Sequence, residues 1–144
     1  MLQRRQTLYL LAVVGFMVAL CLCPMVTYLA DGVEGTLVAF DYWWIGALFS
    51  LCTLLPFVTI WLFKNRMLQV RLLFAEVVLL VGAQIFALWY AIGITGEVKA
   101  MSSLAVATIK TPTFFPLIGI ILTIMAIRAI LKDERLVRSL DRIR

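Results

Sequence analysis

The stretch LLFAEVVLLVGAQIFALWYAIGI, residues 72–94, decides the fold class of this chain. It is an apolar run in which Glu76 is the one charged residue. A helix needs about 20 such residues to cross the hydrocarbon core of a bilayer. The stretch therefore predicts a membrane-spanning helix that carries a carboxyl group about one turn inside one edge of the membrane.

Three further apolar runs of similar length lie at residues 8–28, 43–63 and 113–131. The chain is 64% hydrophobic and 15% charged, with a mean hydropathy of +1.05. Soluble domains are about half apolar and a quarter charged, so this composition excludes that class. We expect an all-α integral membrane protein, a four-helix transmembrane bundle that forms one domain over residues 1–144 and ends in a tail at residues 132–144. Short connections make sequential helices antiparallel neighbours.

The basic residues predict how the spans are oriented. Of the 13 Lys and Arg residues, only Lys99 and Lys110 fall in the connections on one side of the predicted bundle. Cytoplasmic segments of membrane proteins carry the excess of Lys and Arg. Both termini are therefore expected in the cytoplasm. The net charge of +5 reflects orientation in a lipid bilayer, and we expect no nucleic-acid partner.

The two connections on the outer side are too short to hold a domain. Residues 36–40 are expected to form a short extended piece. Residues 95–112 are expected to contain one or two turns of helix lying on the outer interface. The apolar face of that helix would consist of Val98, Met101, Ala105 and Ile109.

The inventory of chemically reactive residues is small. The chain has no His, which is the commonest general base and metal ligand. Cys21 and Cys23 are two residues apart, so on a helix they point about 160° away from each other and cannot readily share a metal or a disulfide. Cys52 is the third thiol. No phosphate-binding loop or nucleophile motif is present, and we expect no enzyme activity, cofactor or metal.

Glu76 is the main candidate for a functional group within the spans. Its spacing of seven residues from Ala83 places the two within about 20° on a helix, so Glu76 is expected to face the interior of the bundle. Arg128 lies about one turn inside the same edge of the antiparallel fourth span and is the predicted ion-pair partner, with Arg5 and Arg71 as substitutes. The carboxyl is either structural or handles a proton or an ion, and the sequence leaves both possibilities open.

Two prolines interrupt the predicted helices. Pro56, in the middle of the second span, leaves the carbonyl of Cys52 without its helical donor, and Pro24 does the same to Leu20. Freed carbonyls can line a binding site, although transmembrane helices also carry proline for shape alone.

The tail, KDERLVRSLDRIR at residues 132–144, reads as a helix that continues the fourth span. Its apolar stripe consists of Leu136, Val137, Leu140 and Ile143. On the other face Arg138 is four residues from Glu134 and three from Asp141, so these charges can pair along the helix. We expect the stripe and Arg138 to dock on a protein surface, either the chain's own turn at residues 65–71 with the N-terminal QRRQ at residues 3–6 or a separate partner. The alternative is a solvated end helix that only fixes the orientation.

MLQRRQTLYLL at the start, RMLQVRL at residues 66–72 and AIRAILKDERLVRSLDRIR at the end resemble a family of small four-span membrane proteins of Bacteroidota, domain of unknown function 4293. The resemblance covers the chain from end to end. It implies an inner-membrane location in a Gram-negative cell, and it implies no activity and no catalytic residue.

Two classes of function are compatible with these observations. The first is a non-enzymatic accessory or scaffold protein of the inner membrane that presents a cytoplasmic docking helix to a protein partner or to a second copy of itself. The second is a small transporter, channel or ligand-binding membrane protein that uses Glu76, Gln84 and the Pro56 interruption around a polar pocket.

Reporter fusions test the predicted topology. Fusions at Phe40 and Val106 are expected to report an external location, and fusions at Leu68 and after Arg144 a cytoplasmic one, because the positive charges flank the latter positions. Paired alkaline phosphatase and green fluorescent protein reporters give opposite signals on the two sides. A cytoplasmic signal at Val106 would contradict the four-span arrangement.

Overall fold

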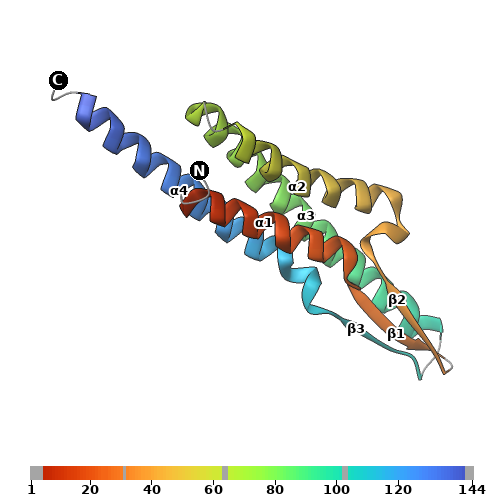
Figure 1. Ribbon diagram of the computed structural model, residues 1–144. Coiled ribbons are helices and arrows are strands. Elements are labelled where there is room, and N and C mark those ends of the chain that lie inside the picture. The colour runs from red at the N-terminus through yellow and green to blue at the C-terminus, as the bar shows by residue number, and fades with distance from the viewer. Residues whose placement is uncertain (1–4, 31, 63–64, 102–103, 142–144) are drawn as a thin grey trace.

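The protein is an elongated arrangement of four α-helices with a small β-sheet at one end (Figure 1). The computed structural model describes residues 5–30, 32–62, 65–101 and 104–141. The helices are α1 (Arg5–Leu22), α2 (Trp43–Trp61), α3 (Arg66–Met101) and α4 (Phe115–Asp141). Helix α1 contacts α2 and α4, and α3 contacts the same two helices. We call the end where α1 begins and α4 finishes the terminal end, and the opposite end the sheet end.

Within the described ranges, three helical segments are long and apolar enough to cross a membrane: Trp43–Trp61, Arg66–Ala100 and Thr111–Leu136. The apolar part of α1, Gln6–Leu22, is shorter. Large apolar side chains such as Leu54 and Val78 lie exposed on the outward faces of the helices. An apolar outer surface of this kind is expected where the helices are surrounded by lipid.

The sheet end contains β-strands beside the end of α3, so the all-α expectation is wrong there. Strands β1 (Val26–Ala30), β2 (Val33–Leu37) and β3 (Val106–Ile109) form an antiparallel sheet in the order β2-β1-β3. The first apolar run, predicted as a helix over residues 8–28, leaves the helix at Leu22 and continues as β1. Pro24 explains the change, because proline lacks a backbone N–H and disfavours helical geometry in the residue before it.

Tight turns join β1 to β2 and the sheet to the helices. Ala30 pairs with Val33, and the turn between them contains Gly32 with φ of 80°, a left-handed conformation that glycine adopts without steric cost. A short 3-10 helix, Ala39–Asp41, leads from β2 into α2, and a second, Thr111–Phe114, leads from β3 into α4. The extended piece expected at residues 36–40 is present over residues 36–38, in the end of β2 and at Val38, and it stops where the 3-10 helix begins at Ala39.

Helix α3 is 36 residues long and extends beyond the predicted span at both ends. Its length of about 54 Å exceeds the roughly 30 Å of a hydrocarbon core. The part of α3 that exceeds this thickness packs against the sheet, because α3 contacts both β1 and β3. One or two turns of helix are indeed present within residues 95–112, but as the end of α3 at residues 95–101 and not as a separate interfacial helix. Val98 is buried against the sheet, and Ile109 belongs to β3.

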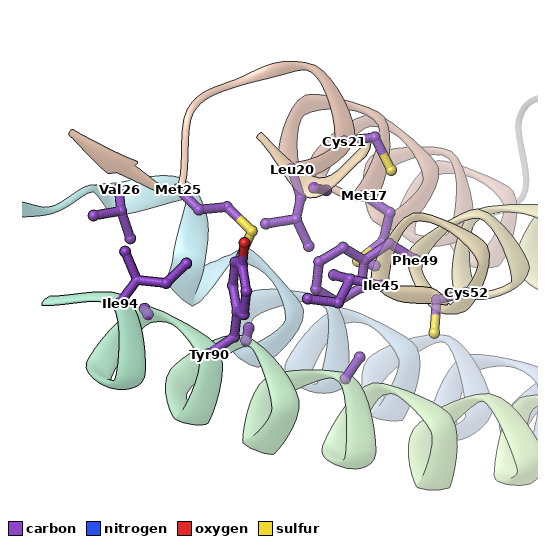
Figure 2. Close-up of a cluster of buried hydrophobic side chains, with 14 of the residues drawn as sticks. Met17, Leu20, Cys21, Met25, Val26, Ile45, Phe49, Cys52, Tyr90 and Ile94 are labelled. Carbon is purple, nitrogen blue, oxygen red and sulfur yellow. The ribbon is translucent and has the colours of Figure 1, made fainter. Parts of the chain in front are cut away.

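Two apolar clusters fill the interior. The larger one lies between the helices and the sheet, and its members include Met17, Met25, Phe49, Ala87 and Ile94. Figure 2 shows part of it, with the Tyr90 ring reaching from α3 toward the sulfur of Met25. The smaller cluster lies toward the terminal end and consists of Leu10, Val70, Leu73, Ala126, Ile127 and Ile130. Along α3, Leu73 belongs to the smaller cluster and Leu80 to the larger one, so Glu76 lies between the two clusters.

Tyr28 and Gly35 form a cross-strand pair on the face of the sheet that packs toward α3. A Cβ atom on Gly35 would collide with the ring of Tyr28, which lies directly over the glycine. The missing side chain of Gly35 therefore provides the space in which the Tyr28 ring packs, an arrangement that also shields the glycine backbone.

Gly35→Ala is expected to displace the Tyr28 ring and lower the free energy of unfolding by about 1–3 kcal/mol, the usual cost of overpacking. Thermal unfolding of the purified protein measures the change. Gly96→Ala is the matched control, because no atom lies within 4 Å of a Cβ placed there. Equal stability of the Gly35→Ala variant and the parent would show that the ring does not depend on this space.

Candidate functional site

Glu76 is buried at the centre of the helices, with 0% of its side chain exposed. The sequence spacing predicted this direction, and Ala83, seven residues further along α3, is also fully buried. Neither carboxyl oxygen of Glu76 has a hydrogen-bond partner among the described residues. Buried polar atoms almost always have a partner, so this carboxyl is the strongest candidate for a functional group in the structure.

Thr123 of α4 lies at the same level as Glu76. A Cβ on Gly119 would lie 3.5 Å from the methyl groups of Leu80, which marks the point where α4 packs on α3. The two helices run antiparallel (Figure 1), so one turn toward the terminal end leads from Leu80 to Glu76 and from Gly119 to Thr123. The fully buried Thr123 hydroxyl donates to the Gly119 carbonyl at 2.8 Å, and its oxygen can still accept a hydrogen bond.

On α2, Cys52 lies at this level, because Gln69 bonds the Thr59 carbonyl and the antiparallel helices place Cys52 and Glu76 each seven residues from that pair. Pro56 is buried inside α2, and it has no N–H to donate to the carbonyl of Cys52. The side chain of Cys52 is fully buried, and its thiol lies within electrostatic range of Glu76. The carboxyl, the Thr123 hydroxyl and the freed carbonyl therefore place three polar groups at the junction between the two apolar clusters.

The predicted ion pair between Glu76 and Arg128 is not present. Arg128 is exposed, and the Glu76 oxygens have no partner among the described residues. Arg128 lies five residues beyond Thr123, which turns it about 140° away from the face of α4 that meets Glu76. The sequence correctly placed the two residues on antiparallel helices, but a similar depth does not ensure that two side chains face each other.

Two buried amides on α3 behave differently from Glu76. Gln69 donates from Nε2 to the Thr59 carbonyl of α2 at 2.9 Å. Gln84 donates from Nε2 to the Thr113 carbonyl at 3.2 Å, and its Oε1 accepts the backbone N–H of Leu117 at 3.0 Å. That N–H belongs to the first turn of α4, where no helical acceptor is available, so Gln84 caps α4 from a neighbouring helix.

The tail continues as part of α4, which ends at Asp141. Figure 1 shows this part of α4 projecting beyond the start of α1 and the end of α2. Leu136 is 56% exposed at the beginning of the predicted stripe. The side chains of the remaining predicted docking residues lie outside the described ones: Val137, Arg138, Leu140 and Ile143.

A shallow hollow of about 240 Å³ separates the projecting helix from the start of α3. It is lined by Met67 of α3 and by Leu131, Glu134 and Arg135 of α4. Met67 belongs to the turn that the sequence named as one docking surface for the tail. The structure thus brings the base of the tail beside that turn, while Leu136 remains largely exposed.

Gln84→Leu is expected to lower the free energy of unfolding by about 1–3 kcal/mol, because it leaves the Leu117 N–H and the Thr113 carbonyl buried and unpaired. Hydrogen exchange read by mass spectrometry is expected to speed up in the first turn of α4. Gln69→Leu, which removes one interhelical hydrogen bond elsewhere on α3, is the control. Unchanged exchange around Leu117 in the Gln84 variant would argue against the capping role.

Comparison with known proteins identifies a family and no individual relative. No curated protein and no solved structure matches the chain. The family described as Domain of unknown function (DUF4293) matches residues 2–143, nearly the whole sequence. The resemblance seen at the two ends and in the turn at residues 66–72 therefore extends over the full length, and the chain belongs to the DUF4293 family.

Proposed function

We propose that this protein is a non-enzymatic integral protein of the cell inner membrane and acts as an accessory or scaffold subunit. In this proposal all four helices cross the membrane and both termini lie in the cytoplasm. The projecting end of α4 is then a docking helix for a protein partner or a second copy of the chain.

The aromatic residues of α2 support a transmembrane position. Trp43 and Trp61 are 82% and 70% exposed and lie at the two ends of this helix. Their positions are about 27 Å apart along the helix axis, close to the thickness of a hydrocarbon core. Tryptophan is enriched at both membrane interfaces, so these two residues suit a helix that crosses once.

Helix α1 is the shortest of the four described helices. Its 18 residues span about 27 Å, slightly less than a typical hydrocarbon core. A small deficit is accommodated by local thinning of the bilayer or by flanking charged residues that extend to the interface. Arg4 and Arg5 occupy that flanking position in the sequence. The packing of α1 against both α2 and α4 supports a shared depth.

The charges at the terminal end support a cytoplasmic location for that end. Basic residues gather there at the start of α3 and along the last turns of α4: Arg66, Arg71, Arg128, Lys132 and Arg135. At the sheet end, Lys99 and Lys110 are accompanied by Glu34, Asp41 and Glu97. This asymmetry follows the positive-inside rule.

The projection of α4 past its neighbours is the main observation that supports the docking role. Within the apolar helices, exposed leucines face lipid, whereas Leu136, which is 56% exposed, follows Asp133, Glu134 and Arg135 in the charged last turns of α4. The acidic residues Asp133, Glu134 and Asp141 weaken attraction to anionic lipid headgroups. A helix with mixed charges and one apolar stripe suits the groove of a protein partner better than a lipid surface.

A second candidate function, a small transporter or ligand-binding membrane protein, is favoured by Glu76. The cost of burying this carboxyl without a partner suggests that its environment is kept for a reason other than stability. The chemistry of that position is independent of the docking role of α4.

Truncation after Leu136 tests the docking role. Deleting residues 137–144, or combining Leu136→Ser with Leu140→Ser, is expected to remove a co-purifying protein or to abolish self-association, because both changes destroy the apolar stripe. Affinity purification from membranes followed by mass spectrometry and by light scattering measures both outcomes.

Asp141→Ser combined with Arg142→Ser is the matched control, because it also introduces two serines but leaves the net charge and the stripe unchanged. The control is expected to keep every partner. If the truncated and the Leu→Ser variants insert normally and retain all co-purifying proteins and the parent's oligomeric state, the tail is only a topology anchor.

A further inference from the structure

The surroundings of Glu76 contain no described basic side chain that could neutralise a carboxylate. On α4, the Thr123 hydroxyl is at its level and Arg128 is exposed on another face. On α1, apolar side chains pack at this depth: Val13 lies beside Gly119 and Leu10 belongs to the smaller cluster with Leu73. On α2, the facing titratable group is the Cys52 thiol, whose ionisation would add a second negative charge and not a positive one.

A carboxylic acid in the neutral form suits this position better than a carboxylate. Burying an ionised carboxyl without a counter-charge or hydrogen bonds is far more costly than burying the acid. The acid also gains one O–H donor. Two groups at this level can accept a hydrogen bond: the Cys52 carbonyl, from which Pro56 withholds the helical donor, and the Thr123 oxygen, whose hydroxyl donates to the Gly119 carbonyl. One proton on Glu76 would therefore supply a donor to either group.

The two buried amides of α3 are already paired, unlike the Glu76 carboxyl. Gln69 and Gln84 on the same helix use their amides to bond neighbouring segments, at 2.9 Å to Thr59 and 3.0 Å from Leu117. A purely structural group at position 76 would be served by such an amide. A carboxyl differs from an amide in one relevant property, which is that it can gain and lose a proton.

We propose that Glu76, with the Thr123 hydroxyl and the freed Cys52 carbonyl, forms a binding site for one exchangeable proton between α2, α3 and α4. On loading, a hydronium ion gives its proton to a carboxyl oxygen and leaves as water. On release, the O–H bond breaks and the proton passes to a water molecule that enters between the helices. No other bond changes. The site is independent of the docking role proposed for α4.

Infrared spectroscopy of the purified full-length protein in lipid vesicles tests the site. The carbonyl stretch of a protonated carboxylic acid is resolved from that of a carboxylate. At neutral pH the parent is expected to show this band, Glu76→Gln is expected to lack it, and Glu34→Gln, which removes an exposed carboxyl, is expected to keep it. Transfer to deuterated buffer is expected to shift the band, and alkaline buffer is expected to remove it.

Thr123→Val provides a second variant that changes no charge and preserves the side-chain shape. Loss of the hydroxyl is expected to move the carbonyl band to higher frequency, because the acid then has fewer hydrogen-bond partners. A band that is indifferent to Thr123→Val belongs to a different carboxyl and overturns the proposed site, even if the Glu76→Gln variant fails to fold.

Three other results would also overturn the proposal. Identical absorbance of the parent and the Glu76→Gln variant in the carbonyl band of protonated carboxylic acids, at neutral pH, would show that Glu76 is ionised. A band that persists in deuterated and in alkaline buffer would show a locked proton with a structural role only. Loss of the band when sodium chloride replaces choline chloride at constant pH would show that the site takes an alkali cation in place of a proton.

Discussion

The backbone of Met25 joins the helices to the sheet, and the rest of the structure depends on this connection. Its N–H donates to the Leu37 carbonyl at 2.8 Å, at the end of β2. Its carbonyl accepts the Lys110 N–H at 2.8 Å and the Thr113 hydroxyl at 3.0 Å, just before α4. Met25 directly follows Pro24, where α1 has ended. The N–H and carbonyl of Met25, which lie beyond the end of α1, are thus paired with the segments that lead into α2 and α4. Backbone groups in an apolar environment need such partners.

Much of the helical part was predictable because it depends on composition and length. Apolar runs of about 20 residues have few stable alternatives to a helix. The sheet was not predicted, because an apolar strand of five residues such as β1 is indistinguishable from the end of an apolar helix by hydrophobicity alone. Two local signals could have found it: Pro24 as a helix end, and the Asp31-Gly32 dipeptide as a hairpin turn. The length of α3 was missed because the contacts of α3 with β1 and β3 override the weak helix propensity of Gly93 and Gly96.

The candidate site was only partly predictable for a related reason. The inward direction of Glu76 follows from helical periodicity, a local property that the sequence contains. The identity of its neighbours depends on how α3 and α4 are rotated about their axes, and that rotation is set by contacts such as Gly119 on Leu80. Depth in the membrane alone indicates Arg128 as the partner of Glu76, whereas the packing of α4 on α3 places Thr123 at this level. Similarly, no sequence pattern indicated that Gln84 would cap α4, because the two segments are joined only in the folded chain.

The buried polar residues Gln69, Glu76 and Gln84 of α3 have different roles in the packing. Gln69 and Gln84 each hold an adjacent segment through hydrogen bonds to backbone groups, toward the terminal end and the sheet end respectively. Glu76 lies between them, where the two apolar clusters meet. Its carboxyl oxygens have no hydrogen-bond partner among the described residues. The two amides therefore stabilise the ends of the helix packing while the level between them remains without an interhelical hydrogen bond to the carboxyl. A group that must exchange a proton benefits from this arrangement, since opening the middle level for a water molecule leaves the bonds made by both amides intact.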